Sequence, residues 1–178
     1  MTSIPRVLSI ISARNFAKKK HAGQLRKNGK TTTFSHLKDV VKNLKKMKVT
    51  NEDTICAGWL HDTIEDTDTD FDSIRQDFGI DVADIVVSVT KDNRLPRKRK
   101  EAKYVRDLKS SNTKAKLVKI ADILANVNDA PNAGRNEKWE KQQFVKKSKY
   151  WSYVSQVKPG KLAELTWAKN EWKRLQKK

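Results

Sequence analysis

The sequence has 178 residues, of which 37% are hydrophobic and 34% charged, and its formal net charge is +18. This length predicts one domain with a sizeable core, and the lack of any run of about twenty apolar residues excludes a membrane-spanning helix. The single cysteine, Cys56, excludes a disulfide framework and predicts a reducing compartment. We therefore expect a soluble, cytoplasmic protein; the sequence does not give its oligomeric state.

The positive charge is spread along the whole chain rather than confined to one tail. Such an excess favours association with polyanions, such as nucleotides, RNA or acidic lipid, although solubility alone is an alternative explanation. We find no zinc-finger spacing, Walker loop, glycine-rich dinucleotide turn or internal repeat in the sequence. The charge by itself therefore names no partner.

Helical periodicity dominates, and no alternating strand pattern of useful length is present. A first helix is expected from about Ser3 to Lys20, and a basic loop over residues 21–30 follows it. Such a loop either places side chains over a pocket or forms an exposed turn. A second helix is expected to begin near Ser35, a good N-cap residue. The apolar stripe of the first helix is Ile4, Val7, Leu8, Ile11 and Phe16, and that of the second is Leu37, Val40, Val41 and Leu44.

A third helix, which a capping box at Thr50 and Asp53 would start, runs into the polar stretch of residues 60–67. If that stretch is helical, one imidazole and three carboxylates (His61, Asp62, Glu65 and Asp66) share one side of the helix. They would repel one another unless a cation lay between them. The apolar run before them carries these groups toward the interior, which favours a bound divalent ion over a solvated acidic helix end.

Further helices follow in the same all-α pattern. A capping box at residues 69–72 starts a helix that Gly79 ends, and a short helix begins near Asp81. The basic run at residues 97–100 is either a phosphate contact or a solvated helix start. In the C-terminal part, the aromatic residues on a basic helix are expected to serve as core, Pro159-Gly160 breaks that helix, and a last helix includes Leu162 and Leu175.

The helix from Ala115 to about Val127 is apolar on nearly all sides, yet it carries Asp122 in its middle. A buried aspartate is unfavourable unless it binds metal or is paired. We expect Asp122 to be a metal ligand, with a buried ion pair as the alternative. Together with His36 and the pair His61-Asp62, it makes a mixed nitrogen and oxygen site for a first-row divalent ion.

The order H…HD…D resembles the metal signature of the HD-domain phosphohydrolases. The resemblance is closer to one branch, the alarmone (guanosine tetraphosphate) hydrolases of the RelA/SpoT type, and especially to the stand-alone small enzymes that include animal SpoT homologues. Four segments within about residues 12–130 carry it: His21-Ala22-Gly23-Gln24-x-Arg26-Lys27-x-Gly29, Leu60-His61-Asp62-x-x-Glu65-Asp66-Thr67, Phe78-Gly79 with Val89-Thr90-Lys91, and Leu117-Val118-Lys119-Ile120-Ala121-Asp122 with Asn126.

The resemblance implies an all-α fold, a single HD-domain helical bundle over residues 1–178 with a metal site at its centre and the helices of residues 135–178 packed on it. Three departures from the family pattern concern substrate preference. Both prolines of the family's second motif are missing from residues 32–37, and Ile123 and Ala125 stand where a basic and a polar or aromatic residue are usual.

By this resemblance the protein removes pyrophosphate from the 3′ position of guanosine tetra- or pentaphosphate, using manganese held by His36, His61, Asp62 and Asp122. Glu65 and Asp66 would orient water and move protons. Arg26 would stack on the base, Lys27 would pair with phosphate or hydroxyl groups, and Asn126 would reach the ribose. Three alternatives stay open: an NADPH 2′-phosphatase, an enzyme that removes 3′-pyrophosphate from tRNA, and a catalytically dead nucleotide- or RNA-binding protein.

Overall fold

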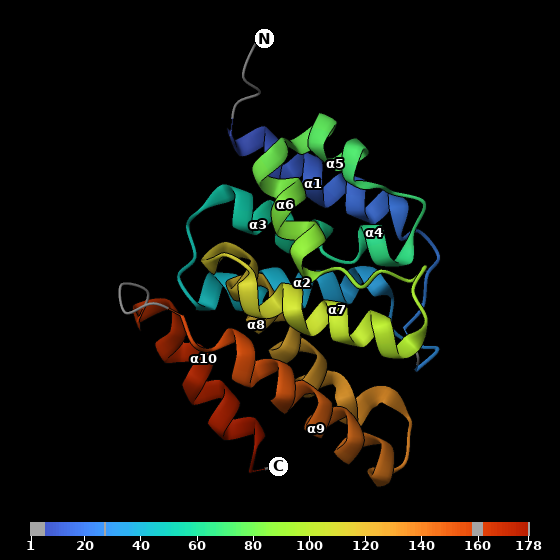
Figure 1. The fold of residues 1–178 in the computed structure, drawn as a ribbon, viewed down its shortest axis with the longest axis vertical. Helices are drawn as coiled ribbons and strands as arrows, with labels where there is room; N and C mark the ends of the chain where they lie inside the picture. Colours follow the sequence, from blue (N-terminus) through green and yellow to red (C-terminus); the bar gives the residue numbers. More distant parts are fainter. Residues whose placement is uncertain (1–5, 27, 158–161, 178) are drawn as a thin grey trace.

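The computed structural model describes residues 6–26, 28–157 and 162–177 (Figure 1). The expected all-α fold is confirmed: in these ranges the only extended pairing is an isolated antiparallel bridge between Leu25 and Thr32. The helices are α1 (Arg6–Lys20), α2 (Thr33–Lys46), α3 (Glu52–Leu60), α4 (Thr63–Asp66), α5 (Phe71–Phe78), α6 (Ile80–Val89), α7 (Arg97–Ser110), α8 (Thr113–Asp129), the 3₁₀ helix η1 (Ala130–Ala133), α9 (Glu137–Val154) and α10 (Leu162–Leu175).

Two predicted helix starts are wrong by a few residues. The cap of α2 is Thr32 and not Ser35, because the Thr32 hydroxyl oxygen accepts a hydrogen bond from the Ser35 N–H, 3.2 Å away. The cap of α3 is Asn51 instead of the Thr50–Asp53 box, and its side chain accepts from the Thr54 N–H at 3.0 Å. In both cases a polar residue with extended backbone stands three positions before the N–H it caps.

The end of α5 is as predicted, whereas its cap is Asp70, one residue after the Thr69 that starts the predicted box. The Asp70 carboxylate accepts from the Ser73 N–H at 2.8 Å, and Gly79 ends the helix with a φ of +90°, a backbone conformation that a side chain disfavours. The basic run at residues 97–100 forms the start of α7. Of the two alternatives for this run, a phosphate contact or a solvated helix start, the structure agrees with the second.

The continuous helix expected through residues 60–67 is wrong. Helix α3 ends at Leu60, and α4 is a separate helix of four residues. The Thr63 hydroxyl donates to the Leu60 carbonyl at 2.6 Å, and the Asp66 N–H donates to the Asp62 carbonyl at 2.9 Å, so the chain turns a corner between the two helices. His61 and Asp62 lie at that corner.

The centre of the fold is α8, which packs against α2, α3, α6, α9 and α10. Most of its side chains are buried, among them Leu117, Val118, Ile120, Ile123 and Leu124. In Figure 1, α1, α5 and α6 lie at one end of the molecule and α9 and α10 at the other. Helix α8 thus brings Asp122 to the middle of the molecule.

The expected apolar stripe of α1 needs a correction. Ile11 is exposed, whereas Ala13 and Ala17 are fully buried, so the small residues of α1 face its neighbour α3. Phe16 is partly buried against the core as expected. Ile4 and the side chains of Val7 and Leu8 lie outside the described residues.

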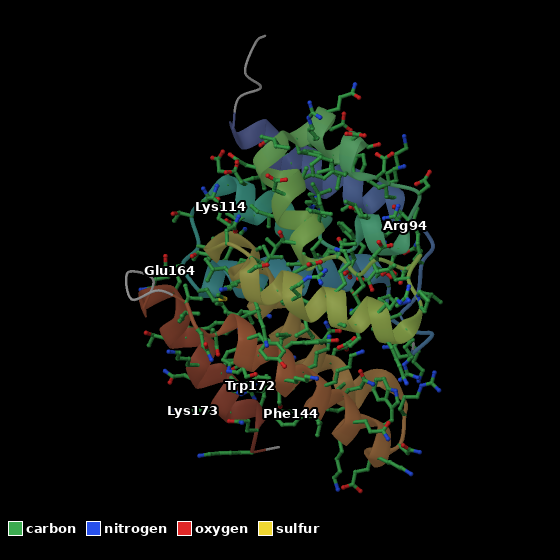
Figure 2. The ribbon with its side chains drawn as sticks, viewed as in Figure 1. Arg94, Lys114, Phe144, Glu164, Trp172 and Lys173 are labelled. Carbon is green, nitrogen blue, oxygen red and sulfur yellow. The ribbon has the colours of Figure 1, made fainter. Side chains whose placement is uncertain are left out.

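The C-terminal aromatic residues serve as core, as predicted. Tyr150 is fully buried, and the Phe144 ring of α9 stacks on the Trp172 ring of α10 with centroids 5.3 Å apart (Figure 2). Trp139 differs, because it lines a pocket without packing against the core cluster. The break predicted at Pro159-Gly160 lies outside the described residues, as does the side chain of Leu162. Among the described helices, none combines the length and the apolar character needed to cross a membrane.

Candidate metal centre

Two histidines and an aspartate from separate elements meet at the core. His36 lies in the first turn of α2, and His61 and Asp62 lie at the corner between α3 and α4. One ligand atom from each of the three lies within 4.8 Å of the others. The Nε2 atom of His61 is 3.2 Å from Asp62 Oδ1, and the Nε2 atom of His36 is 3.8 Å from Asp62 Oδ2. The two imidazoles therefore point their outer nitrogens at one carboxylate.

Asp122 reaches the same point from α8. Its Oδ1 atom is 3.2 Å from His36 Nε2 and 3.8 Å from His61 Nε2. Its Oδ2 atom turns the other way and accepts a hydrogen bond from the buried Lys119 ammonium at 2.7 Å. Thus one oxygen of Asp122 belongs to the histidine cluster, and the other forms the buried ion pair that was the alternative to metal ligation.

The orientation of His61 fits a metal ligand. Its Nδ1 atom is 3.0 Å from the Gly58 carbonyl oxygen, which can only accept, so Nδ1 carries a hydrogen, and in the neutral ring Nε2 presents a lone pair. That Nε2 atom is buried and has no hydrogen-bond partner. An unpartnered imidazole nitrogen aimed at two carboxylates is unfavourable unless a cation joins them. The His/Asp cluster is therefore capable of binding a metal ion.

The electrostatics of the cluster favour a positive charge at its centre. Burial lowers the pKa of His61, but the Asp62 and Asp122 carboxylates outweigh it and raise the pKa to about 9. Burial dominates at His36 and lowers its pKa. The Asp122 pKa is held well below its usual range against the opposing effect of burial, chiefly by the Lys119 charge. Both carboxylates thus stay ionised and available as ligands.

Glu65 lies beside the cluster and is held by the connector between α6 and α7, residues 90–96. Its Oε2 atom accepts from the Lys91 backbone N–H at 2.9 Å, and its Oε1 atom is 3.8 Å from the Lys91 ammonium. The Asn93 side chain donates to the Glu65 carbonyl at 3.0 Å. The position of this carboxylate is therefore fixed from two sides.

Asp66 lies at the exposed rim, and its backbone is anchored by the loop after α1. The Gln24 amide donates to the Asp66 carbonyl at 3.0 Å, and the Oε1 atom of Gln24 is 2.7 Å from Nδ1 of the buried His21. Partial burial, followed by repulsion from Asp62 and Glu65, raises the pKa of the Asp66 carboxyl. Of the two acids, Asp66 is the one whose carboxylate is less restrained by neighbouring groups.

Arg26 and Asn126, the two expected substrate contacts in the described part of the chain, lie together. The Arg26 Nη2 atom donates to Asn126 Oδ1 at 2.9 Å, and Arg26 Nε is 3.1 Å from Asp129 Oδ2. The Asn126 amide in turn donates to the Asp122 carbonyl at 3.0 Å and contacts the Asp122 carboxylate. These hydrogen bonds link Arg26, the residue expected to stack on the base, through Asn126 to Asp122 in the metal cluster. Lys27 lies outside the described residues.

Most of these side chains line one cavity of about 1210 Å³; His21, His61 and Asn93 are not among its lining residues. The basic run at residues 97–100 is not among its lining residues. The cavity also has a basic wall that the sequence did not single out, formed by Lys91 of the connector and Lys146 and Lys147 of α9. Lys91 and Lys119 were visible in the quoted motifs, but nothing in the pattern of α9 separates Lys147 from the other lysines of that helix. His21 and Gln24 also belong to a quoted motif, but the sequence analysis assigned no role to either residue.

Comparisons with known proteins agree with this geometry. The family model of the HD domain matches residues 13–149. A zebrafish (Danio rerio) protein named guanosine-3′,5′-bis(diphosphate) 3′-pyrophosphohydrolase MESH1 is 38% identical over 148 residues, 82% of this chain and 80% of its own length. The human protein of that name is 34% identical over 153 residues, 85% of this chain and 83% of its own length.

Solved structures show the same fold. A protein described as a metazoan ortholog of SpoT that hydrolyzes ppGpp superposes with a TM-score of 0.84 at 25% identity, over 99% of this chain and 97% of the other. A protein from Listeria monocytogenes superposes with a TM-score of 0.56 at 26% identity, over 79% of this chain and 96% of the other.

Proposed function

This chain belongs to the HD-domain family and, within it, to the guanosine-3′,5′-bis(diphosphate) 3′-pyrophosphohydrolases. From that premise we propose that it hydrolyses the 3′-pyrophosphate of guanosine tetra- or pentaphosphate and releases GDP or GTP and pyrophosphate. The observation that carries the proposal is the convergence of His36, His61, Asp62 and Asp122 on one point at the cavity.

Manganese is our choice for the metal, held by those four residues. A bound divalent ion would lower the pKa of water and polarise a phosphoryl oxygen. Two imidazoles and two carboxylates suit several first-row ions, and the general affinity order places zinc and copper above manganese. The choice of manganese therefore depends on the family resemblance, and metal analysis of the purified protein tests it.

Glu65 and Asp66 have different parts in the reaction. Because the Lys91 N–H and ammonium hold the Glu65 carboxylate in place, Glu65 is suited to orienting the attacking water. Because the pKa of Asp66 is raised and its carboxyl is exposed at the cavity, Asp66 is suited to carrying a proton to or from the reacting oxygens. Together they form an acid–base pair beside the metal ligands.

The nucleoside is placed against Arg26 and Asn126. A planar guanidinium stacks on a base, and Asn126 can exchange its bond to Arg26 for one to a ribose hydroxyl. Lys27, next in the same motif, is proposed to pair with phosphate or hydroxyl groups. These contacts would orient the 3′ substituent toward the metal ligands.

One assay separates this function from its rivals. Metal-loaded protein is given guanosine tetraphosphate, NADPH and a tRNA with a 3′-pyrophosphate, and the released phosphate species is identified. We expect pyrophosphate from the first substrate at the highest rate. Orthophosphate from NADPH would make the protein a 2′-phosphatase instead. Steeply salt-dependent RNA affinity without turnover would favour the binding protein with a dead hydrolase fold, for which the net charge of +18 provides a rationale.

The remaining expectations stay predictions. The single domain over residues 1–178 is supported by the packing of α9 and α10 on α8, and the cytoplasmic location by the one cysteine, which is buried and free.

A further inference from the structure

The core-facing side of α9 contains a lysine among aromatic residues. Phe144, Lys147, Tyr150 and Val154 are spaced three or four residues apart and so lie on one face of the helix. Tyr150 and Val154 are fully buried and Phe144 packs on the core, whereas Lys147 is half-buried and lines the cavity. A cation on such a face is costly unless an anion meets it.

Among the described residues Lys147 has no ion pair, although the Asp122 and Asp62 carboxylates act on it from farther away. No carboxylate in the described part of the chain lies within ion-pair distance of its ammonium, although its neighbour Lys119 is paired with Asp122 at 2.7 Å. Lys146, the adjacent residue, has its ammonium 5.9 Å from the centroid of the Tyr150 ring. The Lys91 ammonium is equally 5.9 Å from that centroid and 3.8 Å from Glu65. We name Lys91, Lys146 and Lys147 the lysine cluster.

The pKa shifts agree with an excess of positive charge. Burial lowers the pKa of Lys147 to about 8. The Asp122 and Asp62 carboxylates oppose this shift, and the charges of Lys119 and Lys91 add to it. Burial and the Lys119 charge also lower the pKa of Lys91. An arriving anion would relieve both effects.

The lysine cluster and the nucleoside contacts lie on opposite sides of the metal ligands along α8. Asn126, one turn after Asp122, bonds Arg26. Lys119, about one turn before Asp122, has its ammonium 5.7 Å from the centroid of Tyr150, the ring that Lys91 and Lys146 also face. Since one helical turn rises about 5.4 Å, Asn126, Asp122 and Lys119 follow one another along α8, and Lys119 lies at the end where Tyr150 and the lysine cluster are. The order matches a nucleoside carrying a 3′-diphosphate.

We propose that the lysine cluster, with Lys147 at its centre, binds the terminal phosphate of the leaving pyrophosphate and so selects 3′-diphosphates over 3′-monophosphates. This proposal rests on the proposed function. It makes Lys147 a substrate-binding residue whose contribution exists only when a second phosphate is present, because the first phosphate lies at the metal ligands.

The test compares two substrates that differ only at the 3′ position: guanosine tetraphosphate and guanosine 5′-diphosphate 3′-monophosphate. Lys147→Met removes the charge and keeps the length of the side chain. We expect it to lower kcat/KM for the diphosphate about tenfold or more, the usual consequence of losing a charged hydrogen bond, and to change the monophosphate less than about threefold. Inhibition by inorganic pyrophosphate should weaken by the same factor, and inhibition by orthophosphate should not.

Matched variants exclude general charge and folding effects. Lys149→Met removes a lysine that is exposed on the same helix and does not line the cavity, so it should behave as wild type. Lys147→Arg keeps the charge and should retain the preference for the diphosphate. If Lys147→Met fails to fold, Lys146→Met, at an exposed position, tests the cluster by the same ratio of substrates.

The outcomes are distinct. Equal losses on both substrates, or none on the diphosphate, would overturn the proposal and leave the function in place. If the wild type hydrolyses neither nucleotide, the proposed function fails, and the cluster is then judged by calorimetric binding of inorganic pyrophosphate to manganese-loaded wild type and Lys147→Met. Equal affinity of the two proteins there would overturn the cluster as well.

Discussion

The two walls of the cavity differ in how their charged groups are compensated. On the first wall, from α2, α3, α4 and α8, imidazoles and carboxylates lie within about a hydrogen bond of one another, and backbone groups fix several of them. On the second wall, from α9 and the connector after α6, lysines face the rings of Tyr104 and Tyr150 and are short of acidic partners. The first wall suits a cation and the second suits an anion. A phosphate ester bound to a metal would supply both.

The largest effect is expected when a candidate metal ligand of the first wall is removed. Asp62→Asn should abolish metal binding and hydrolysis together, because it removes the charge of a ligand shared by both histidines. Metal content and turnover are measured on the same sample. Asp62 is partly exposed and makes no pair with Lys119, so the fold should be retained, and circular dichroism serves as the control.

Asp122 provides the contrasting case within the same wall. Asp122→Ala should also lose metal and activity, but it leaves the buried Lys119 ammonium without its partner, at a cost of about 3–5 kcal/mol in the free energy of unfolding. Urea denaturation measures this difference from Asp62→Asn. Full metal occupancy and wild-type turnover in either variant would contradict the site assignment.

A smaller effect is expected from the acid–base pair at the edge of the first wall. Glu65→Gln and Asp66→Asn should keep the metal bound and lower kcat by about 10²–10⁴-fold, the usual contribution of positioned proton-transfer groups. Because Glu65 is fixed by Lys91 and Asp66 is not, the Glu65 variant tests positioning and the Asp66 variant tests proton transfer. A loss of metal in either variant would place the residue among the ligands instead.

The nucleoside contacts should give a still smaller loss, expressed mainly in KM. Asn126→Ala removes the acceptor for Arg26 Nη2 and is expected to raise KM about tenfold with kcat changed less. Arg26 keeps its pair with Asp129 in that variant. Metal content is the control, because the Asn126 amide also contacts the Asp122 carboxylate. A fall in kcat alone would mean that Asn126 acts through Asp122.

The smallest expected effect concerns the packing that supports the first wall. A Cβ at Gly58 would lie 2.6 Å from the Leu44 Cδ1 atom, so Gly58→Ala overpacks the contact between α2 and α3. Overpacking lowers the free energy of unfolding by about 1–3 kcal/mol. The higher helix propensity of alanine offsets up to about 1 kcal/mol of this loss, so a small net loss of stability is expected. Combining it with Leu44→Ala in a double-mutant cycle should show the two changes to be coupled. Strictly additive losses would mean that this contact is not close.

The comparison of the walls also separates what was predictable from what was not. The sequence named candidate residues for the first wall. Two features were chemically unusual where they stand, an aspartate in an apolar helix and a histidine–aspartate pair after an apolar run, and the other residues were named through the family resemblance. The predicted geometry of that pair was wrong, since a corner between α3 and α4 replaces a continuous helix. Local hydrogen bonds of Thr63 and Asp66 decide that corner, and their effect is not visible in helical periodicity.

The sequence alone determined the helical class of the fold and named the candidate metal ligands, since periodicity and misplaced charges are local properties of the chain. Only the tertiary structure decided which of the many lysines would matter. A lysine on a basic helix is ordinary by composition, and it becomes a candidate anion site only when α9 packs on α8 and turns Lys147 toward the cavity that Asp122 also faces.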